Sequence, residues 1–212
     1  MNRDGKHITY LCPDDAVQNA RAAGSFRVCD PELYDAMRAA MRARRPRSIA
    51  ELTRLPVWHR NMAWFSDAVP TDRHGPSRQA WFRSGLAALT GSDLIVCDPD
   101  NGIAWDSPTP SAKHILPEEI AGILLSGASA VIYHHCDRSA SHEEQGQRHA
   151  DEIRRRHPEL AHIIPLRFRR GSSRLYLVLA QPAHRDWIAT VVAGMRTMPW
   201  FTLRHFTVSD SR

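Results

Sequence analysis

The sequence lacks any long hydrophobic run, and this absence excludes a membrane-spanning protein. No apolar stretch among the 212 residues approaches the roughly 20 that a transmembrane helix needs. The first residues, Met1 to His7, also lack the apolar segment of a secretory signal peptide. We therefore expect a cytoplasmic protein with no membrane partner.

Cysteine is scarce, and none of the four cysteines belongs to a C-x-x-C pair; they are Cys12, Cys29, Cys97 and Cys136. This spacing excludes a small disulfide-stapled scaffold and predicts reduced thiols, some of them packed in the core. A zinc site would require cysteines from unrelated segments to converge with a histidine. We therefore predict no metal ligands among them.

Motifs of several enzyme classes are absent as well. The chain contains no G-x-G-x-x-G, no G-x-x-x-x-G-K-[ST] and no G-x-S-x-G sequence. The first two motifs cradle phosphates with glycine-rich backbone, and the third exposes the nucleophilic serine of α/β-hydrolases. These absences argue against a standard nucleotide-binding first strand and against a hydrolase of that type.

The composition that remains is that of a globular domain, because hydrophobic residues make up 42% and charged residues 24% of the chain. Lys and Arg number 28 against 23 Asp and Glu, which gives a net charge of +5. A mildly basic chain permits a polyanionic partner such as nucleic acid but does not demonstrate one.

Hydrophobic periodicity predicts alternating helices and strands in the second half of the chain. We expect helices over residues 76–89, 117–125 and 141–157, and buried strands over residues 93–98 and 128–133. The third helix begins with a capping box of Ser141 and Glu144. This alternation predicts right-handed crossovers and a parallel sheet with helices on its faces.

The pattern changes after residue 160. Apolar strands over 163–168 and 175–179 flank a turn that contains Gly171, which predicts an antiparallel hairpin at the edge of the sheet. A helix over 183–195 and a terminal strand within 201–208 follow. The predicted fold is a single Rossmann-like α/β domain over residues 1–212, with an open, mostly parallel sheet, helices on both faces and this C-terminal hairpin.

The first half of the chain carries weaker signals. A helix over 31–44 with Asp30 as its N-cap is the clearest of them. Short strands are expected over 7–11 and 62–65, and residues 45–60 fit no single pattern.

Two predicted strands end in unusual polar turns, and both ends should open onto one crevice if the strands are neighbours in a parallel sheet. The first turn reads Asp98-Pro99-Asp100-Asn101-Gly102. A carboxylate directly after a buried strand is held rigidly, so Asp98, Asp100 and Asn101 are candidates to bind a metal or an amine. The simpler interpretation is a turn built from turn-forming residues.

The second strand ends in His134-His135-Cys136-Asp137-Arg138. Successive strand residues face opposite ways, so only one of the two histidines can point into a given pocket. That histidine would be a general base or a metal ligand. In the alternative interpretation, one histidine packs in the core and the other faces solvent.

Basic residues supply candidate phosphate contacts. Lys113, Arg138 and Arg169 are the ones we single out, together with the arginine-rich stretches 42–47, 154–157 and 167–170. Each stretch is also compatible with a solvated helix end or turn.

The motifs Asp98-Pro99-Asp100-Asn101-Gly102 and Val131-Ile132-Tyr133-His134-His135, with Asp4-Gly5-Lys6-His7-Ile8, Asp30-Pro31-Glu32-Leu33 and Arg167-Phe168-Arg169-Arg170-Gly171, resemble a family of uncharacterised bacterial and phage-borne proteins over most of the chain. That family is distantly similar to Rossmann-like, S-adenosylmethionine-dependent adenine-N6 methyltransferases. In those enzymes a strand ends in Asp/Asn-Pro-Pro-aromatic, and here Asp100 and Asn101 replace the second proline and the aromatic residue. The family's upstream segment, with its Gly-Asp and Lys-Tyr motif, is expected to be missing from this sequence.

The resemblance implies that S-adenosylmethionine is the cofactor and nucleic acid the substrate. It implies that Asp98 and Asn101 orient the acceptor amine, that His134 or His135 lines the pocket, and that Lys113 and Arg138 meet phosphate.

Two other functions are compatible with the same residues. A metal-dependent nuclease or phosphoesterase would bind Mg²⁺ through Asp98, Asp100 and a histidine. A non-catalytic nucleic-acid-binding module would use the basic residues alone. Whether the protein is an enzyme is left open by the sequence.

Overall fold

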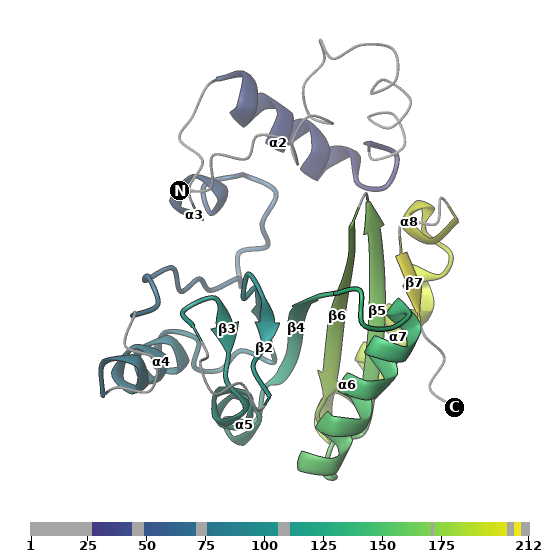
Figure 1. Cartoon of the computed structure of the whole chain (residues 1–212). Coiled ribbons are helices and arrows are strands. Elements are labelled where there is room, and N and C mark those ends of the chain that lie inside the picture. The colour runs from purple at the N-terminus through teal and green to yellow at the C-terminus, as the bar shows by residue number, and fades with distance from the viewer. Residues whose placement is uncertain are drawn as a thin grey trace.

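The computed structural model describes residues 27–43, 49–70, 76–105, 111–170, 172–202 and 206–208 (Figure 1). A five-stranded mixed sheet has the strand order β1-β4-β6-β5-β7, and a two-stranded sheet joins β2 to β3. The strands are β1 (Leu94–Cys97), β2 (Gly102–Ile103), β3 (His114–Ile115), β4 (Ser129–His135), β5 (His162–Arg170), β6 (Ser172–Ala180) and β7 (Phe206–Val208).

The helices account for most of the remaining described chain. They are α2 (Pro31–Arg42), α3 (Ile49–Leu52), α4 (Pro76–Ala88), α5 (Pro117–Leu125), α6 (His142–Arg156), the 3₁₀ turn η2 (Pro182–His184), α7 (Arg185–Met195) and α8 (Pro199–Thr202). The fold class is therefore α/β, as the alternating periodicity predicts.

The prediction of a mostly parallel sheet is wrong. Only β1 and β4 run parallel in the five-stranded sheet, and the pairs β4–β6, β6–β5 and β5–β7 are antiparallel. The apolar runs of β5 and β6 resemble buried strands of either orientation, because burial on both faces erases the alternation that marks an antiparallel strand.

The expected position of β5 and β6 is wrong as well. These strands pair antiparallel along their whole length, but β6 lies between β4 and β5 at the centre of the sheet, not at its edge. Leu175, Leu177 and Leu179 of β6 are each at most 1% exposed, in agreement with a central position.

Local signals at helix ends are confirmed. The Asp30 carboxylate accepts a hydrogen bond from Leu33 N and begins α2. Ser141 and Glu144 form the expected capping box at the start of α6. Pro117 opens α5, and Glu118 lies in its first turn, where the helix dipole favours a negative charge.

Other local predictions differ from the structure. Residues 62–65 form no strand. Of the expected strand within 201–208, only 206–208 form a strand, β7, whereas 201–202 end α8 and 203–205 lie outside the described residues. Helix α2 ends at Arg42, two residues before the expected end, and α3 occupies part of the segment that fitted no single pattern. The expected strand over 7–11 lies outside the described residues.

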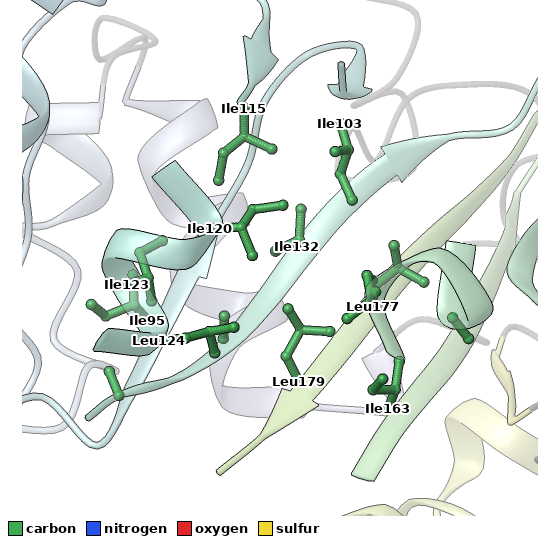
Figure 2. Packing of buried hydrophobic residues seen from close by; sticks show 14 residues of the cluster. Ile95, Ile103, Ile115, Ile120, Ile123, Leu124, Ile132, Ile163, Leu177 and Leu179 are labelled. Carbon is green, nitrogen blue, oxygen red and sulfur yellow. The ribbon is translucent and has the colours of Figure 1, made fainter. Parts of the chain in front are cut away.

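Buried apolar side chains cover both faces of the sheet. On one face, residues of α5 and α6 pack against β1, β4 and β6, and Figure 2 shows Ile120 beside Ile132 in this cluster. On the other face, Ile188 and Val192 of α7 pack against β5 and β6. The predicted helices on both faces are thus confirmed. The two faces of β4 lie against different sets of side chains.

A buried ion pair joins α4 to α5. The Arg78 guanidinium lies 2.7 Å and 2.9 Å from the two carboxylate oxygens of Glu119, and the two side chains are only 3% and 6% exposed. Arg78 also donates to the carbonyl oxygens of Ser111 and His114. The same Glu119 carboxylate accepts from Leu116 N at the start of α5. One arginine therefore holds the chain on both sides of Lys113.

Within the described residues, no helix is long and apolar enough to cross a membrane.

We predict that Arg78→Met lowers the free energy of unfolding by about 3–5 kcal/mol, because it leaves the Glu119 carboxylate buried without a partner. Adding Glu119→Gln should recover part of this loss, since glutamine keeps the hydrogen bond to Leu116 N and removes the unpaired charge. Urea denaturation followed by circular dichroism measures both changes.

The matched control is Lys113→Met, which breaks an ion pair whose side chains are both 63% exposed. That substitution should change stability by no more than about 1 kcal/mol. Equal losses for Arg78→Met and Lys113→Met would contradict the role given to the buried pair.

Candidate functional site

Residues 98–102, which we name the acidic turn, follow β1 directly and are tied down by backbone hydrogen bonds. Gly102 N donates to the Pro99 carbonyl oxygen at 3.1 Å, and Asn101 N donates to the Lys113 carbonyl oxygen at 2.9 Å. The second bond links the turn to the segment that Arg78 holds. The turn is therefore fixed, although Asp98, Asp100 and Asn101 remain exposed.

Lys113 and Asp100 form an ion pair across this turn. The ammonium Nζ lies 2.7 Å from Asp100 Oδ2, and both side chains are 63% exposed. An exposed pair of this kind contributes little to stability. The positive charge of Lys113 therefore balances the negative charge of Asp100. The phosphate contact that the sequence assigns to Lys113 stays a prediction.

Asp98 is the carboxylate of the turn with the most perturbed environment. Partial desolvation, and then the negative charge of Asp100, raise the pKa of Asp98, while Arg174 of β6 acts in the opposite direction. The side chain is still exposed, so solvent screens these effects. Asp98 is thus a carboxylate with increased affinity for a hydrogen-bond donor, set between a negative and a positive neighbour.

His134 fills the space beneath the acidic turn. Its Nδ1 accepts a hydrogen bond from Ile103 N at 3.1 Å. Gly102 has a φ of +89°, and a Cβ at this position would lie 2.3 Å from His134 Nδ1. Glycine is therefore required here twice, for its backbone conformation and for the space that the imidazole occupies.

His149 of α6 completes an imidazole pair with His134. The two ring centroids are 3.9 Å apart, and His149 Nδ1 accepts from Trp105 Nε1 at 2.8 Å. Burial is the main cause that lowers the pKa of His134 to about 3 and that of His149 to about 4. Both rings are therefore neutral near pH 7.

The hydrogen bonds of the imidazole pair assign its tautomers. Because Nδ1 accepts in both rings, the ring proton of each lies on Nε2. An Nε2–H group donates a hydrogen bond and has no lone pair for a metal ion or a proton. In this arrangement His134 acts as a support for the acidic turn and as a donor, not as a base.

His135 lies on the opposite face of β4, as strand alternation predicts. Its Nδ1 is 3.2 Å from the Tyr133 hydroxyl, and Arg174 acts on the same hydroxyl, lowering the pKa of Tyr133 against the larger effect of burial. Tyr176 packs edge-on against Tyr133 with ring centroids 5.8 Å apart. We name Tyr133, His135, Arg174 and Tyr176 the tyrosine–arginine cluster.

Sheet register explains how the tyrosine–arginine cluster forms. Tyr133 pairs with Tyr176, and His135 pairs with Arg174, across the antiparallel strands β4 and β6. Paired residues project from the same face of a sheet, so all four side chains share one surface. Desolvation raises the pKa of both tyrosines, which keeps their hydroxyl groups protonated.

The remaining predicted cations are distributed around this region. Arg138 is exposed in the loop after β4, and Arg169 is exposed near the end of β5. The register pairs Arg169 with Ser173, one residue from Arg174 along β6, so alternation places the two arginines on opposite faces. The structure thus brings Asp98 together with Arg174 and not with Arg169.

The donor groups of this region give little basis for a metal centre. In the part of the chain that the structure describes, no three His, Cys, Asp or Glu side chains come together as a metal site. Asp100 already pairs with Lys113, and the Nδ1 atom of His134 accepts from Ile103 N. The acidic turn itself offers Mg²⁺ the carboxylates of Asp98 and Asp100 and the amide oxygen of Asn101.

The described cysteines are free thiols, namely Cys29, Cys97 and Cys136. Burial raises the pKa of all three, and that of Cys97 reaches about 12. These thiols therefore stay protonated and unreactive near neutral pH, in agreement with the predicted reduced thiols. Cys12 lies outside the described residues.

Several residues of both surfaces are absent from the sequence-based prediction. His149 and Trp105 support the imidazole pair, and Tyr133, Arg174 and Tyr176 form the opposite surface. The spacing of Tyr133 and His135 places them on one strand face and was available as a signal. Arg174 required knowing that β6 pairs with β4, which no local pattern reveals.

We predict that Gly102→Ala destabilises the protein by about 2–4 kcal/mol, the sum of a strained backbone and a displaced imidazole. Gly127→Ala is the matched control, because Gly127 also has a φ of +89° but has no atom near the position of the added Cβ. It should cost only about 1–2 kcal/mol. Urea unfolding of the two variants measures the difference, and equal losses would show that the contact with His134 does not matter.

The imidazole pair also predicts a loss of stability in mild acid. Its folded-state pKa values, about 3 and about 4, lie below the ordinary value of 6.5. The unfolded chain therefore binds protons that the folded chain does not, so this stability is complete above pH 6.5 and is lost as the pH falls toward 4 and then 3.

Between pH 7.5 and 5, each histidine should contribute a loss of about 1–2 kcal/mol. His149→Gln keeps an acceptor for Trp105 Nε1 and should reduce the loss by that amount. The measurement is the unfolding free energy of both proteins at the two pH values. An identical pH dependence in His149→Gln and the unmodified protein is the contradicting outcome.

Comparisons of the chain with family models, with curated proteins and with solved structures find no match. The candidate functional groups are therefore the side chains on the two faces of β4. One side supports the acidic turn through neutral imidazoles, and the other presents the tyrosine–arginine cluster beside Asp98.

Proposed function

We propose that this protein binds an amine-bearing nucleobase of a nucleic acid at the acidic turn. The observation that carries the proposal is the position of Asp98. This exposed carboxylate, whose pKa is raised, follows a strand that runs parallel to β4, and it feels the charge of Arg174. A hydrogen-bond acceptor, an arginine and two aromatic rings thus gather at the carboxyl end of β4.

Each part of this surface suits one part of a nucleotide. The Asp98 carboxylate accepts hydrogen bonds from an exocyclic amine, which adenine and cytosine carry and thymine lacks. Tyr176 is half-buried, lies within reach of the charge of Asp98 and offers an aromatic ring for stacking. Asn101, exposed in the same turn, adds an amide that both donates and accepts.

The order β1, crossover, β4 gives this proposal its place in the fold. The two strands are parallel, and α5 lies in the connection between them. Ligands of open α/β sheets bind beyond the carboxyl ends of such strands. We propose that this unit is the Rossmann-like part of the domain, and that the protein is methyltransferase-like in the way its acidic turn meets a base.

The described residues do not show where S-adenosylmethionine, the cofactor that the resemblance implies, would bind. The space beside Gly102 is filled by His134, so the turn offers no open glycine-rich backbone. The other described glycines with positive φ, Gly91 and Gly127, precede β1 and β4 at the opposite end of these strands. We derive no methyl-transfer step, and the cofactor stays a prediction to be tested by calorimetry on this chain.

The two alternative functions make different demands on Asp98. A Mg²⁺-dependent nuclease needs Asp98 and Asp100 to share a metal, and so requires the ion pair of Asp100 with Lys113 to open. A non-catalytic module that holds only phosphates does not need Asp98 at all. Neither alternative has an observation that favours it over base binding.

We predict that the unmodified protein binds oligodeoxyadenylate more tightly than oligodeoxythymidylate of equal length, and that Asp98→Ala lowers this ratio by about tenfold, the value of one charge-assisted hydrogen bond. Thymidylate binding should stay constant or tighten, because the substitution removes a negative charge near the phosphates. Fluorescence anisotropy at fixed salt measures both affinities.

Asp93→Ala is the matched control, since Asp93 is exposed and precedes the same strand at its other end. It should leave the ratio unchanged. Equal binding of the two oligomers, or a ratio that survives Asp98→Ala, would overturn the proposal. Cleavage that appears with Mg²⁺ and disappears with a chelator would favour the nuclease alternative instead.

A further inference from the structure

Arg174 is one of several cations of the described chain that belong to no ion pair, and it lies beside His135 on one face of the sheet. Arg78 pairs with Glu119, Lys113 pairs with Asp100, and the arginines that end α6 pair with acidic residues one turn earlier. In the described part of the chain, no ion pair includes Arg174, although Asp98 is near enough to feel its charge. Arg174 is half-buried and reaches the surface.

A hydrogen bond joins Tyr133 and His135 on this surface, since the Tyr133 hydroxyl lies 3.2 Å from His135 Nδ1. The tautomer of His135 decides which of the two groups donates. When the hydroxyl donates, the ring proton of His135 lies on Nε2, where it can bond to an acceptor. Arg174, which pairs with His135 across the strands, also acts on the Tyr133 hydroxyl.

Two kinds of donor therefore lie on one surface. The guanidinium of Arg174 has five N–H groups, and His135 adds its Nε2–H in the tautomer that accepts from Tyr133. Cross-strand pairing keeps the two residues side by side. The surface next to them holds no acidic side chain that ion-pairs with Arg174. The group that satisfies such a set is an anion with several acceptor oxygens.

We propose that Arg174 and His135 bind a phosphate group of the nucleic acid whose base meets Asp98. This inference rests on the proposed function and deepens it, because it gives the phosphate contact to Arg174 and His135, whereas the sequence gives it to Lys113, Arg138 and Arg169. A planar guanidinium matches two phosphate oxygens at once, and an imidazole N–H reaches a third.

Asp98 sets the strength of this phosphate site. Its negative charge acts on Arg174 without forming an ion pair, so it weakens the attraction of an added anion. The same side chain is the acceptor in the proposed base site. Removal of the Asp98 charge therefore weakens base binding and strengthens phosphate binding, and these opposite effects separate the two proposals.

The test is a titration of the ¹⁵N-labelled full chain with inorganic phosphate, followed by the NMR signals of the arginine Nε–H groups. We expect saturable binding that Arg174→Gln weakens about tenfold and His135→Gln about threefold, the larger loss belonging to the guanidinium that binds two oxygens. Asp98→Asn should tighten binding about twofold. Arg185→Gln, at the start of α7, is the matched control and should change nothing.

A second probe distinguishes the sources of phosphate. Dimethyl phosphate represents the backbone diester, and inorganic phosphate represents a terminal monoester; saturable binding of either at Arg174 supports the inference. Where Arg174→Gln fails to fold, Arg174→Lys replaces it. This variant keeps the charge but loses the planar fork, so an intermediate affinity is the supporting result.

The inference is overturned if Arg174→Gln, or the lysine variant in its place, binds both probes as tightly as the unmodified protein. It is also overturned if neither probe saturates. Phosphate binding at Arg174 without preference for adenylate over thymidylate would support this site and remove the proposed base site. Preference for adenylate without phosphate binding at Arg174 would do the reverse.

Discussion

The buried ion pair of Arg78 and Glu119 is the interaction on which the acidic turn depends. It connects α4 to α5, and the other donors of Arg78 hold the carbonyl groups on either side of Lys113. Lys113 in turn meets Asp100 through its side chain and Asn101 through its carbonyl group. The buried ion pair of Arg78 and Glu119 thus determines the position of the exposed ion pair of Lys113 and Asp100. Because a lone buried charge is so costly, this arrangement has few nearby alternatives.

Strand β4 divides the chemistry of the molecule. His134 faces the helices α5 and α6, where burial keeps it neutral and makes it a support for Gly102. His135 faces the other way and belongs to an exposed surface with Tyr133 and Arg174. Two adjacent residues of the same type therefore have different surroundings and different partners. Their difference comes from the alternation of a strand and from what covers each of its faces.

Local signals in the sequence predict the elements well and their arrangement poorly. The caps at Asp30 and Ser141, the proline at the start of α5 and the apolar runs of β1 and β4 are decided by neighbouring residues, and the structure agrees with them. The central place of β6 depends on which strand pairs with β4. The leucine-rich sequence of a strand does not identify its pairing partner. The acidic turn and the consecutive histidines His134 and His135 are visible as motifs in the sequence. Arg174 and His149 are not visible in this way, because only strand pairing and helix packing bring them to the site.

The antiparallel pairing of β4 with β6 also determines which changes in chain length the site can accept. Arg174 shares a surface with His135 because of one register, and a single residue inserted between Arg174 and Leu179 would turn Arg174 to the face of His134. Residues added in the loop between β4 and α6 would leave that register intact. Proteins that share this surface should therefore vary in length in the loop after β4, while the spacing within β6 stays constant. This difference would distinguish a functional surface from one without a function.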